Sequence, residues 1–475
     1  MTNLISFLKQ QPKRDIVLIQ GLGFVGSVMS LVCSNAINRD YTVLGIELET
    51  DRGKKIIDDL NNGVFPLLAQ DPKIDQFFKS TLEKGNFFAT YDTEAYKYAS
   101  IIIVDINLDV KKNNDNSGVL KGYTVNLDGF KSAIKTIGDN CKEDALILIE
   151  TTVPPGTCEE IIKPIIYKCL IKRDLSTDKI KIGHSYERVM PGPDYINSIQ
   201  NFYRVYSGID DKSADAVESF LKTIIFTKEY PLTRLDNTNS TEIAKVLENS
   251  YRAMNISLIV EWSRYAEEAK VNLYEIIDAI RLRPTHANLM YPGIGVGGYC
   301  LTKDALLASW SRQNLLGKSE PLLQSEIAIN INDQMPKYAF RFLKKEYRSL
   351  ANCNVLLLGV SYRGEVGDTR NTPVANLHDY LIKDGAFVTC HDPFVENWVQ
   401  KSISINTDLS KLLTNNIDII IISTGHSIYK NQNTIDMILK LRPLFIFDTI
   451  GFLSNEQIST LQNVHTVKVL GRGDL

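Results

Sequence analysis

Asp15-Ile-Val-Leu-Ile-Gln-Gly-Leu-Gly-Phe-Val-Gly26 is the stretch of sequence that decides the fold of the N-terminal part of this chain. Residues 15–20 form an apolar run of strand length, and residues 27–36 continue with helical periodicity directly after the last glycine. A strand, a glycine turn and a helix in this order predict the start of a dinucleotide-binding βαβ unit. In such a unit the three glycines make the tight turn, let a pyrophosphate approach the backbone, and allow the helix to pack closely on the strand.

An acidic residue stands where this unit would hold a ribose. The next strand-like run, residues 41–46, ends at Glu47, which lies 21 positions after Gly26. A carboxylate here accepts a hydrogen bond from a ribose 2′-hydroxyl and repels a 2′-phosphate, so the sequence predicts NAD rather than NADP. The alternative is a glycine turn in an unrelated α/β unit. The predicted cofactor-binding residues of the unit are Gly21, Gly23, Phe24, Val25, Gly26 and Glu47.

Two further strand-like runs, residues 101–104 and 145–149, each follow helical material and predict a parallel, doubly wound sheet. The second run leads into the loop from Glu150 to Thr157. Because ligands bind at the carboxyl ends of parallel strands, we expect Thr152 of this loop to contact the cofactor. A polar strand end without function is the alternative.

A long helix and a second α/β module follow. The helix is expected to start at Asn239, with Glu242 completing the cap, and its apolar stripe comprises Ile243, Val246, Leu247, Tyr251, Met254, Leu258, Trp262 and Tyr265. Strand-like runs return at 353–358, 387–393, 417–422 and 444–448 without a G-x-G-x-x-G motif. The predicted fold class is α/β, with an N-terminal Rossmann domain (1–236), a central helical spine (237–350) and a C-terminal Rossmann-like domain (351–475). Arg363 and Arg370, in the first loop of the last domain, suit a different nucleotide ligand.

Composition excludes several classes of protein. The net charge of −3 over 475 residues gives no electrostatic signal for nucleic-acid binding. The longest apolar run near the C-terminus, 417–422, is interrupted by Asp418 and is too short to span a bilayer, and the N-terminus does not resemble a secretory signal. Seven cysteines without paired spacing argue against a disulfide framework and against a metal site. We therefore expect a cytoplasmic enzyme that contacts neither nucleic acid nor membrane.

One cysteine stands apart from the others. Residues 292–304, Pro-Gly-Ile-Gly-Val-Gly-Gly-Tyr-Cys-Leu-Thr-Lys-Asp, deliver Cys300 from a glycine-rich turn towards the start of a predicted helix. The positive end of a helix dipole favours a reactive thiolate, and Asp304 lies four positions later. A cysteine near a nicotinamide implies covalent capture of an aldehyde, since a thiohemiacetal is itself a hydride donor and gives a hydrolysable thioester. The alternative is a small buried cysteine after a tight loop.

Taken together, these motifs resemble the nucleotide-sugar 6-dehydrogenases, the family that includes UDP-glucose and UDP-N-acetylmannosamine dehydrogenases. The resemblance covers nearly the whole chain and rests on residues 21–26, 150–157, 187–192, Lys245 with Asn249, 295–304, 359–363 and 367–370. It implies two successive NAD-dependent oxidations of the C-6 alcohol of a UDP-sugar to a uronic acid. It also implies a homodimer, or a higher homo-oligomer, built through the central helices.

The resemblance assigns a role to each matching position. Cys300 would be the nucleophile, Lys245 would stabilise the oxyanion, Asn249 would bind the reacting oxygen, and Asp304 and Glu187 would activate water. Lys303 and Arg370 would add to the cofactor site, as would Thr152. The implied substrate-binding residues are Glu187, Arg188, Val189, Lys245, Asn249, Arg281, Tyr291, Gly295, Gly297, Tyr362 and Arg363.

Two departures from the family pattern bear on the substrate and on the chemistry. Residues 104–109 read Val-Asp-Ile-Asn-Leu-Asp where relatives carry a Val-Pro-Thr-Pro-like loop, so the threonine that helps position water is not evident. Arg363 stands where many UDP-glucose enzymes have lysine. The Glu-Arg-Val-x-Pro-Gly form at 187–192 favours a UDP-N-acetylhexosamine over UDP-glucose as substrate. A single-step hydroxyacid dehydrogenase and a non-catalytic NAD sensor are the competing hypotheses.

Overall fold

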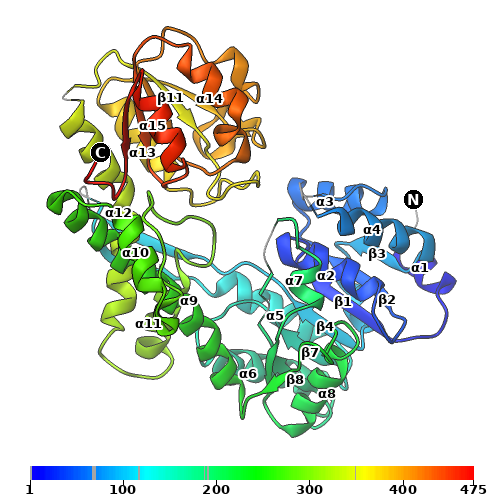
Figure 1. Cartoon of the computed structure of the whole chain (residues 1–475). Coiled ribbons are helices and arrows are strands. Elements are labelled where there is room, and N and C mark those ends of the chain that lie inside the picture. Colours follow the sequence, from blue (N-terminus) through cyan, green and yellow to red (C-terminus); the bar gives the residue numbers. More distant parts are fainter. Residues whose placement is uncertain (1–2, 67–70, 116–117, 187, 190–191, 348) are drawn as a thin grey trace. The chain divides into compact units, whose positions relative to one another are not determined.

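The structure is a computed structural model that describes residues 3–66, 71–115, 118–186, 188–189, 192–347 and 349–475. The chain forms two compact units (Figure 1). The first unit consists of Met1–Lys111, Thr124–Leu247 and Leu307–Pro321, and the second consists of Lys112–Tyr123, Glu248–Leu306 and Leu322–Leu475. The three predicted domain ranges stay a prediction.

The first unit is built on an eight-stranded sheet in the order β10-β9-β8-β7-β4-β1-β2-β3. Its neighbouring strands are parallel except for β8 and β9, which are antiparallel. The central strands are mostly apolar and almost entirely buried, as a sheet covered on both faces requires. The strands are β1 (Ile16–Gln20), β2 (Thr42–Ile46), β3 (Phe87–Thr90), β4 (Ile101–Val104), β7 (Leu146–Ile149), β8 (Lys181–His184), β9 (Val205–Gly208) and β10 (Thr233–Arg234).

Helices cover both faces of this sheet. One apolar core joins β1 and β2 to α2, α4 and α8. On the other face, α5 and α6 pack against each other. Right-handed connections between parallel strands place helices on both faces in this way. The helix α2 directly follows the glycine turn, which confirms the predicted βαβ start. The helices of the unit are α1 (Leu4–Gln10), α2 (Phe24–Ser34), α3 (Asp51–Asn61), α4 (Pro72–Lys84), α5 (Asp128–Asn140), α6 (Lys163–Lys172), α7 (Asn197–Gln200) and α8 (Asp211–Leu221).

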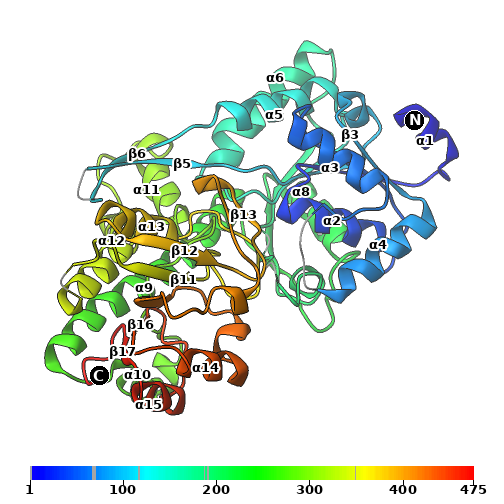
Figure 2. The same ribbon diagram turned by 90° about the horizontal axis from the view of Figure 1, so that it is seen from above.

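The second unit contains a five-stranded parallel sheet in the order β12-β11-β15-β16-β17. Figure 2 shows α12 and α13 on one face of this sheet and α14 and α15 on the other, and two separate apolar cores match these faces. The predicted second α/β module is thereby confirmed. Its elements are α12 (Leu323–Glu346), β11 (Asn354–Leu358), α13 (Val374–Lys383), β12 (Phe387–His391), β15 (Ile419–Ile422), α14 (Gln432–Leu439), β16 (Phe445–Asp448), α15 (Asn455–Gln462) and β17 (Thr466–Val469).

Three further helices, α9 (Thr238–Ala269), α10 (Leu273–Arg281) and α11 (Asp304–Asn314), come between the two sheets in the order of the sequence. The strands β5 (Val110–Asn114) and β6 (Leu120–Val125) pair as a separate two-stranded sheet, as do β13 (Asn397–Trp398) and β14 (Ile403–Ser404). Shorter turns of helix occur at Thr93–Lys97, Cys158–Ile162, Pro284–His286, Val399–Lys401, Leu409–Lys411 and Ser427–Lys430. Along the described ranges, no helix has the length and apolarity needed to cross a membrane.

The predicted cap of the long helix is wrong. The helix α9 begins at Thr238, and Asn237 caps it by accepting a hydrogen bond from Ser240 N at 2.9 Å. Glu242 is fully buried and its carboxylate instead accepts hydrogen bonds from Gly156 N at 2.7 Å and Cys158 N at 2.8 Å. A tertiary contact with two backbone amides therefore replaces the local contact that the spacing suggests.

Candidate active site

In the glycine turn of the first unit, only one of the three glycines, Gly23, has free space beside its Cα. Gly21 has φ of +94° and donates its N–H to Ile46 O at 2.9 Å, and a Cβ there would lie 2.4 Å from Asp105 O. A Cβ at Gly26 would lie 1.8 Å from Gly21 O, whereas a Cβ at Gly23 would meet nothing within 4 Å. Gly21 and Gly26 are thus required by packing. Gly23 faces open space at the N-terminus of α2, where a phosphate group is favoured.

Glu47 lies beside this turn. It follows β2, the strand next to β1, and its carboxylate accepts hydrogen bonds from Leu22 N and from Leu48 N, both at 2.9 Å. Phe24 and Val25 form the first turn of α2. An open glycine backbone, a helix N-terminus and a carboxylate at the end of the next strand together fit the pyrophosphate and ribose of NAD.

The loops after β4 and β7 complete this edge of the sheet. Thr151 Oγ1 accepts a hydrogen bond from Ile106 N at 3.0 Å and lies 3.0 Å from Val104 O, to which it donates. Thr152 follows and is half-buried. In the loop that departs from the family pattern, Asn107 is exposed and Asp105 N donates to Gln20 O at 2.9 Å. Thr151 therefore ties the two loops together at the place where the sequence predicts cofactor contacts.

Lys245 of α9 is buried in the first unit against an aromatic ring. Only 5% of its surface is exposed, and its Nζ lies 5.4 Å from the centre of the Tyr186 ring. The guanidinium of Arg188 lies 5.3 Å from the same ring, and its Nη1 donates to Tyr203 O at 2.7 Å. Val189 packs against the core of the unit. Glu187, predicted as a catalytic and substrate-binding residue, lies outside the described residues.

A buried histidine, His184, lies close enough to Lys245 to feel its positive charge. His184 ends β8 with no exposed surface, and its Nδ1 lies 2.8 Å from Thr241 Oγ1. Burial, with further contributions from the positive charges of Lys245 and Arg204, lowers the pKa of His184 to about 3. The imidazole is therefore neutral at physiological pH. Arg204 is itself buried and forms an ion pair with Glu150.

In the second unit, Cys300 lies in the turn that precedes α11. The helix begins at Asp304, and Cys300 O accepts hydrogen bonds from Lys303 N at 3.2 Å and from Asp304 N at 2.9 Å. The residue Cys300 is half-buried, and no disulfide joins the cysteines that the structure describes. Gly298, with φ of +81°, donates to Arg370 O at 3.0 Å, so the loop is attached to the C-terminal sheet.

The glycines of this loop accept the close approach of Tyr362. A Cβ at Gly297 would lie 2.6 Å from Tyr362 Cβ, and a Cβ at Gly298 would lie 3.0 Å from its ring. Burial raises the pKa of Tyr362. On the other side, Asn332 Oδ1 accepts from Val296 N at 2.7 Å, next to Gly295 with φ of +111°. The structure thus brings the predicted substrate residues Gly295, Gly297 and Tyr362 to the cysteine loop.

Asp304 organises the polar groups next to Cys300. Its carboxylate has no exposed surface and lies 2.8 Å from Lys303 Nζ. Its other oxygen accepts a hydrogen bond from Asn249 Nδ2 at 2.7 Å. Lys303 is itself only 5% exposed, and its Nζ lies 4.4 Å from the centre of the Tyr299 ring. The buried side chains of Asn249, Lys303 and Asp304 therefore form one polar cluster, and the half-buried Cys300 joins it through its backbone.

The predicted arginines lie at three places in the second unit. Arg363 is exposed, whereas Arg370 forms a two-pronged ion pair with Asp368 at 2.7–3.0 Å. Arg281 stacks on Tyr291, with 4.7 Å between the guanidinium carbon and the ring centre. The role of each arginine towards a ligand stays a prediction.

Sequence reasoning missed three residues that shape these sites. Tyr186 supports Lys245, Tyr299 lies between Lys303 and Arg370, and Asp368 holds the Arg370 guanidinium. Each one adjoins a predicted residue in sequence, or stands two positions from it. An aromatic or acidic neighbour of a predicted cation was the signal that could have found them.

Three models of one family match successive parts of the chain. The NAD binding domain of the UDP-glucose/GDP-mannose dehydrogenase family matches residues 15–225, its central domain matches residues 239–333, and its UDP binding domain matches residues 356–455.

Similar proteins are known over nearly the full length. The UDP-N-acetyl-D-mannosamine dehydrogenase of Pyrococcus horikoshii is 26% identical, across 97% of this chain and 100% of that protein. Its solved structure has a TM-score of 0.79 to the present one. The UDP-N-acetyl-D-mannosamine dehydrogenase of Methanococcus aeolicus is 29% identical, across 89% of this chain and 87% of that protein.

Proposed function

This chain belongs to the UDP-glucose/GDP-mannose dehydrogenase family, and from this premise we propose that it oxidises the C-6 alcohol of a UDP-N-acetylhexosamine to the acid in two NAD-dependent steps. The observation that carries the proposal is that Cys300, on a glycine loop, is followed by Asp304, whose buried carboxylate is bonded to Asn249 of α9. The similarity to UDP-N-acetyl-D-mannosamine dehydrogenases over 97% of the chain supports this class of sugar.

NAD, when bound, accepts the electron pair of each oxidation. Gly23 leaves the backbone open to the pyrophosphate, the first turn of α2 with Phe24 and Val25 offers its N–H groups, and Glu47 accepts from the ribose. Thr152, Lys303 and Arg370 are further proposed contacts. Lys303 and Arg370 are already engaged by Asp304 and Asp368, which would hold them in place for a ligand.

Cys300 supplies the covalent step. The first oxidation converts the alcohol to an aldehyde, and the Cys300 thiolate adds to the aldehyde carbon to form a thiohemiacetal. Loss of a hydride and of the hydroxyl proton gives a thioester, and water then cleaves the carbon–sulfur bond to release the acid and the thiol. Each substrate thereby consumes one water and two NAD and gives two NADH.

The polar neighbours of Cys300 hold and move the protons. Asn249 is held by its hydrogen bond to Asp304 at 2.7 Å, which supports the proposal that its amide binds the reacting oxygen. Asp304 is the proposed group that organises water for thioester hydrolysis, together with Glu187. Lys245, buried against Tyr186, is the proposed donor to the developing oxyanion.

The remaining assigned residues are proposed to bind the UDP-sugar. Arg188 and Val189 follow Tyr186 in the first unit, while Gly295, Gly297 and Tyr362 surround the cysteine loop in the second. The exposed guanidinium of Arg363 and the Arg281–Tyr291 pair suit phosphate or carbonyl oxygens.

We further propose that the enzyme is a homodimer formed through α9. Five large apolar side chains on this helix stay between 37% and 73% exposed in the single chain. Spacings of four and seven residues place them on one helical face, as in a helix that pairs with a second helix. They are Ile243, Leu247, Tyr251, Leu258 and Tyr265.

We also propose that the enzyme acts in the reducing cytoplasm, which the seven free cysteines support.

The stoichiometry of NADH tests the proposed reaction. Limiting UDP-N-acetylmannosamine, UDP-N-acetylglucosamine or UDP-glucose is incubated with the enzyme and excess NAD, and NADH is measured by absorbance. Two NADH per molecule of one UDP-N-acetylhexosamine are expected, with a uronic acid as product. One NADH with an accumulating aldehyde or ketone contradicts the two-step reaction, and a preference for UDP-glucose contradicts the assigned sugar.

A further inference from the structure

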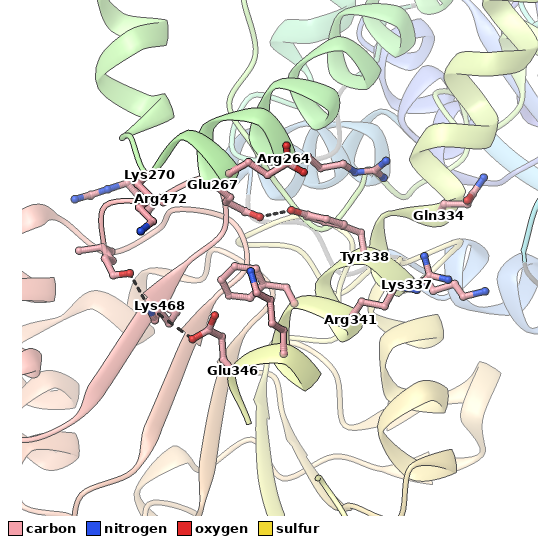
Figure 3. A pocket seen from close by; sticks show the side chains of 15 residues that line it. Arg264, Glu267, Lys270, Gln334, Lys337, Tyr338, Arg341, Glu346, Lys468 and Arg472 are labelled. Atoms are coloured by element: carbon pink, nitrogen blue, oxygen red, sulfur yellow. Dashed lines mark hydrogen bonds and ion pairs between the residues drawn. The ribbon is translucent and has the colours of Figure 1, made fainter. Parts of the chain in front are cut away.

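The second unit contains a cationic cavity away from the cysteine loop. Its volume is about 740 Å³, and its walls come from the end of α9, the second half of α12 and the segment from β17 to residue 475 (Figure 3). Seven of its fifteen lining residues are lysine or arginine, and three are glutamate. The cavity therefore carries an excess of positive charge.

Two of the three glutamates in the wall, Glu267 and Glu346, already have partners. Glu267 accepts a hydrogen bond from Gly471 N at 2.8 Å and another from the Tyr338 hydroxyl. Glu346 lies 3.8 Å from Lys468 Nζ. These contacts hold α9, α12 and the C-terminal segment together. Within the described ranges, two of the seven lysines and arginines in the wall have a carboxylate partner, since Lys468 pairs with Glu346 and Arg472 pairs with Asp474 at 2.7 Å.

A row of cations on α12 faces the cavity. Lys337, Arg341 and Lys345 are spaced four residues apart, so they share one side of the helix, and residues 336–345 contain no acid. Within the part of the chain that the structure describes, neither Arg341 nor Lys345 forms an ion pair, and both are exposed. Like charges at this spacing repel one another and destabilise a helix, and an anionic ligand would offset that repulsion.

A fourth cation is fixed at the opposite wall. The guanidinium carbon of Arg264 lies 4.7 Å from the centre of the Tyr338 ring, and the Tyr338 hydroxyl is anchored on Glu267. Arg264 is therefore held in position by stacking, and among the residues that the structure describes no carboxylate lies within ion-pair distance of its N–H donors. Phe342 adds a second aromatic ring to the lining.

We propose that this cavity binds a small polyanion carrying two or more phosphate groups, at a site separate from that of the substrate. The cations of α12 extend over about 12 Å of helix, so a ligand with several anionic groups engages more of them than a single phosphate does. The volume is that of a pocket for a nucleotide-sized molecule. The aromatic rings of Tyr338 and Phe342 offer a surface to its uncharged part.

The position along α9 separates this cavity from the cysteine loop. Arg264 stands fifteen residues after Asn249 on the same helix, a rise of about 22 Å. With about 3.6 residues per turn, Glu267 of the cavity wall lies on the side of α9 opposite Leu258.

Calorimetric titration of the full chain with inorganic tripolyphosphate tests the proposal. The variant Arg341→Gln/Lys345→Gln removes two cavity cations, and the control Lys383→Gln/Lys440→Gln removes two exposed lysines outside the cavity. A third variant, Arg363→Gln, removes a cation of the proposed substrate site. The cavity variant is expected to raise the Kd about tenfold or more, because two charge-assisted contacts are lost, whereas both other variants stay within about twofold of the unmodified chain.

Three results would overturn the proposal. Equal loss of binding in the cavity variant and the lysine control would show a general charge effect. Loss confined to Arg363→Gln would place the anion in the substrate site. Binding to phosphatidylglycerol vesicles without any binding of tripolyphosphate would assign the cations to a membrane surface. The NADH stoichiometry is independent of all three results.

Discussion

The buried pair of Lys303 and Asp304 leads to a quantitative prediction. The two side chains are 5% and 0% exposed, their charged atoms lie 2.8 Å apart, and Asp304 also holds Asn249. In the variant Asp304→Asn the bond from Asn249 can persist through the amide oxygen, but Lys303 loses its counter-charge. Removing one partner of a buried pair costs about 3–5 kcal/mol of unfolding free energy, because a desolvated charge is left behind.

The double variant Lys303→Met/Asp304→Asn separates charge from packing. It removes both charges and keeps similar volumes, so we expect it to recover at least half of the stability that Asp304→Asn loses. The matched control is Glu94→Gln, which breaks the pair of Glu94 and Lys97 at 2.5 Å, where both side chains are about half exposed. That change should cost less than about 1 kcal/mol.

Urea unfolding followed by circular dichroism measures these differences, and hydrogen exchange of peptides that cover residues 298–306 shows whether the loss is local. The reasoning is refuted if Asp304→Asn stays within 1 kcal/mol of the unmodified chain. It is equally refuted if the double variant is no more stable than the single one.

Four further changes have defined outcomes. Cys300→Ser should stop release of the acid, because no thioester forms; product chromatography that finds undiminished uronate contradicts the nucleophilic role. Glu47→Ala should raise the NADP-to-NAD ratio of kcat/KM about tenfold, and an unchanged ratio would mean that Glu47 does not touch the ribose. His184 has a folded-state pKa of about 3 against 6.5 for the free side chain, so the unfolded state binds more protons between these values and stability falls as the pH drops. Between pH 6.5 and 5 this loss is about 2 kcal/mol, and urea titrations should find it absent in His184→Gln. Tyr251→Glu should give a monomer in light scattering, since it puts a charge into the exposed face of α9; a persistent dimer would contradict that interface.

Local patterns predicted the sheets well. Between Asp15 and Gly26, an apolar run predicts a strand and the glycines predict a tight turn before a helix. The structure has β1, Gly21 at positive φ and α2 in that order. Apolar runs of strand length likewise located β4, β7, β11 and β15 to within a few residues. These elements follow from neighbouring residues, so the sequence alone suffices.

Contacts between distant residues were harder to predict. Glu242 has the right spacing for a capping box with Asn239. Its carboxylate instead accepts hydrogen bonds from Gly156 N and Cys158 N, which lie more than eighty residues away in the sequence. Periodicity also revealed the apolar stripe of α9, but it could not say that Val246 is buried while Tyr251 is exposed. Both outcomes depend on which surfaces the rest of the chain presents.

In the candidate site too, contacts between neighbouring residues were predicted and contacts between distant residues were not. Cys300 and Asp304 were predicted as a pair from their spacing of four positions, and the structure joins them through the hydrogen bond from Asp304 N to Cys300 O. The approach of Tyr362 to Gly297 and Gly298 spans more than sixty residues and has no local signature. Glycines allow such a close approach, but they do not identify the neighbour.

The interleaved order of the two compact units has a consequence for how this protein can be made and cut. The chain passes from one unit to the other near residues 111, 123, 247, 306 and 321, so no single break in the backbone releases either unit. A ribosome must deliver Leu307–Pro321 before the first unit has all its parts, long after its sheet has been synthesised. Fragments for expression, and a protease that nicks one loop, should therefore yield pieces that remain associated or fail to fold, rather than two independent halves.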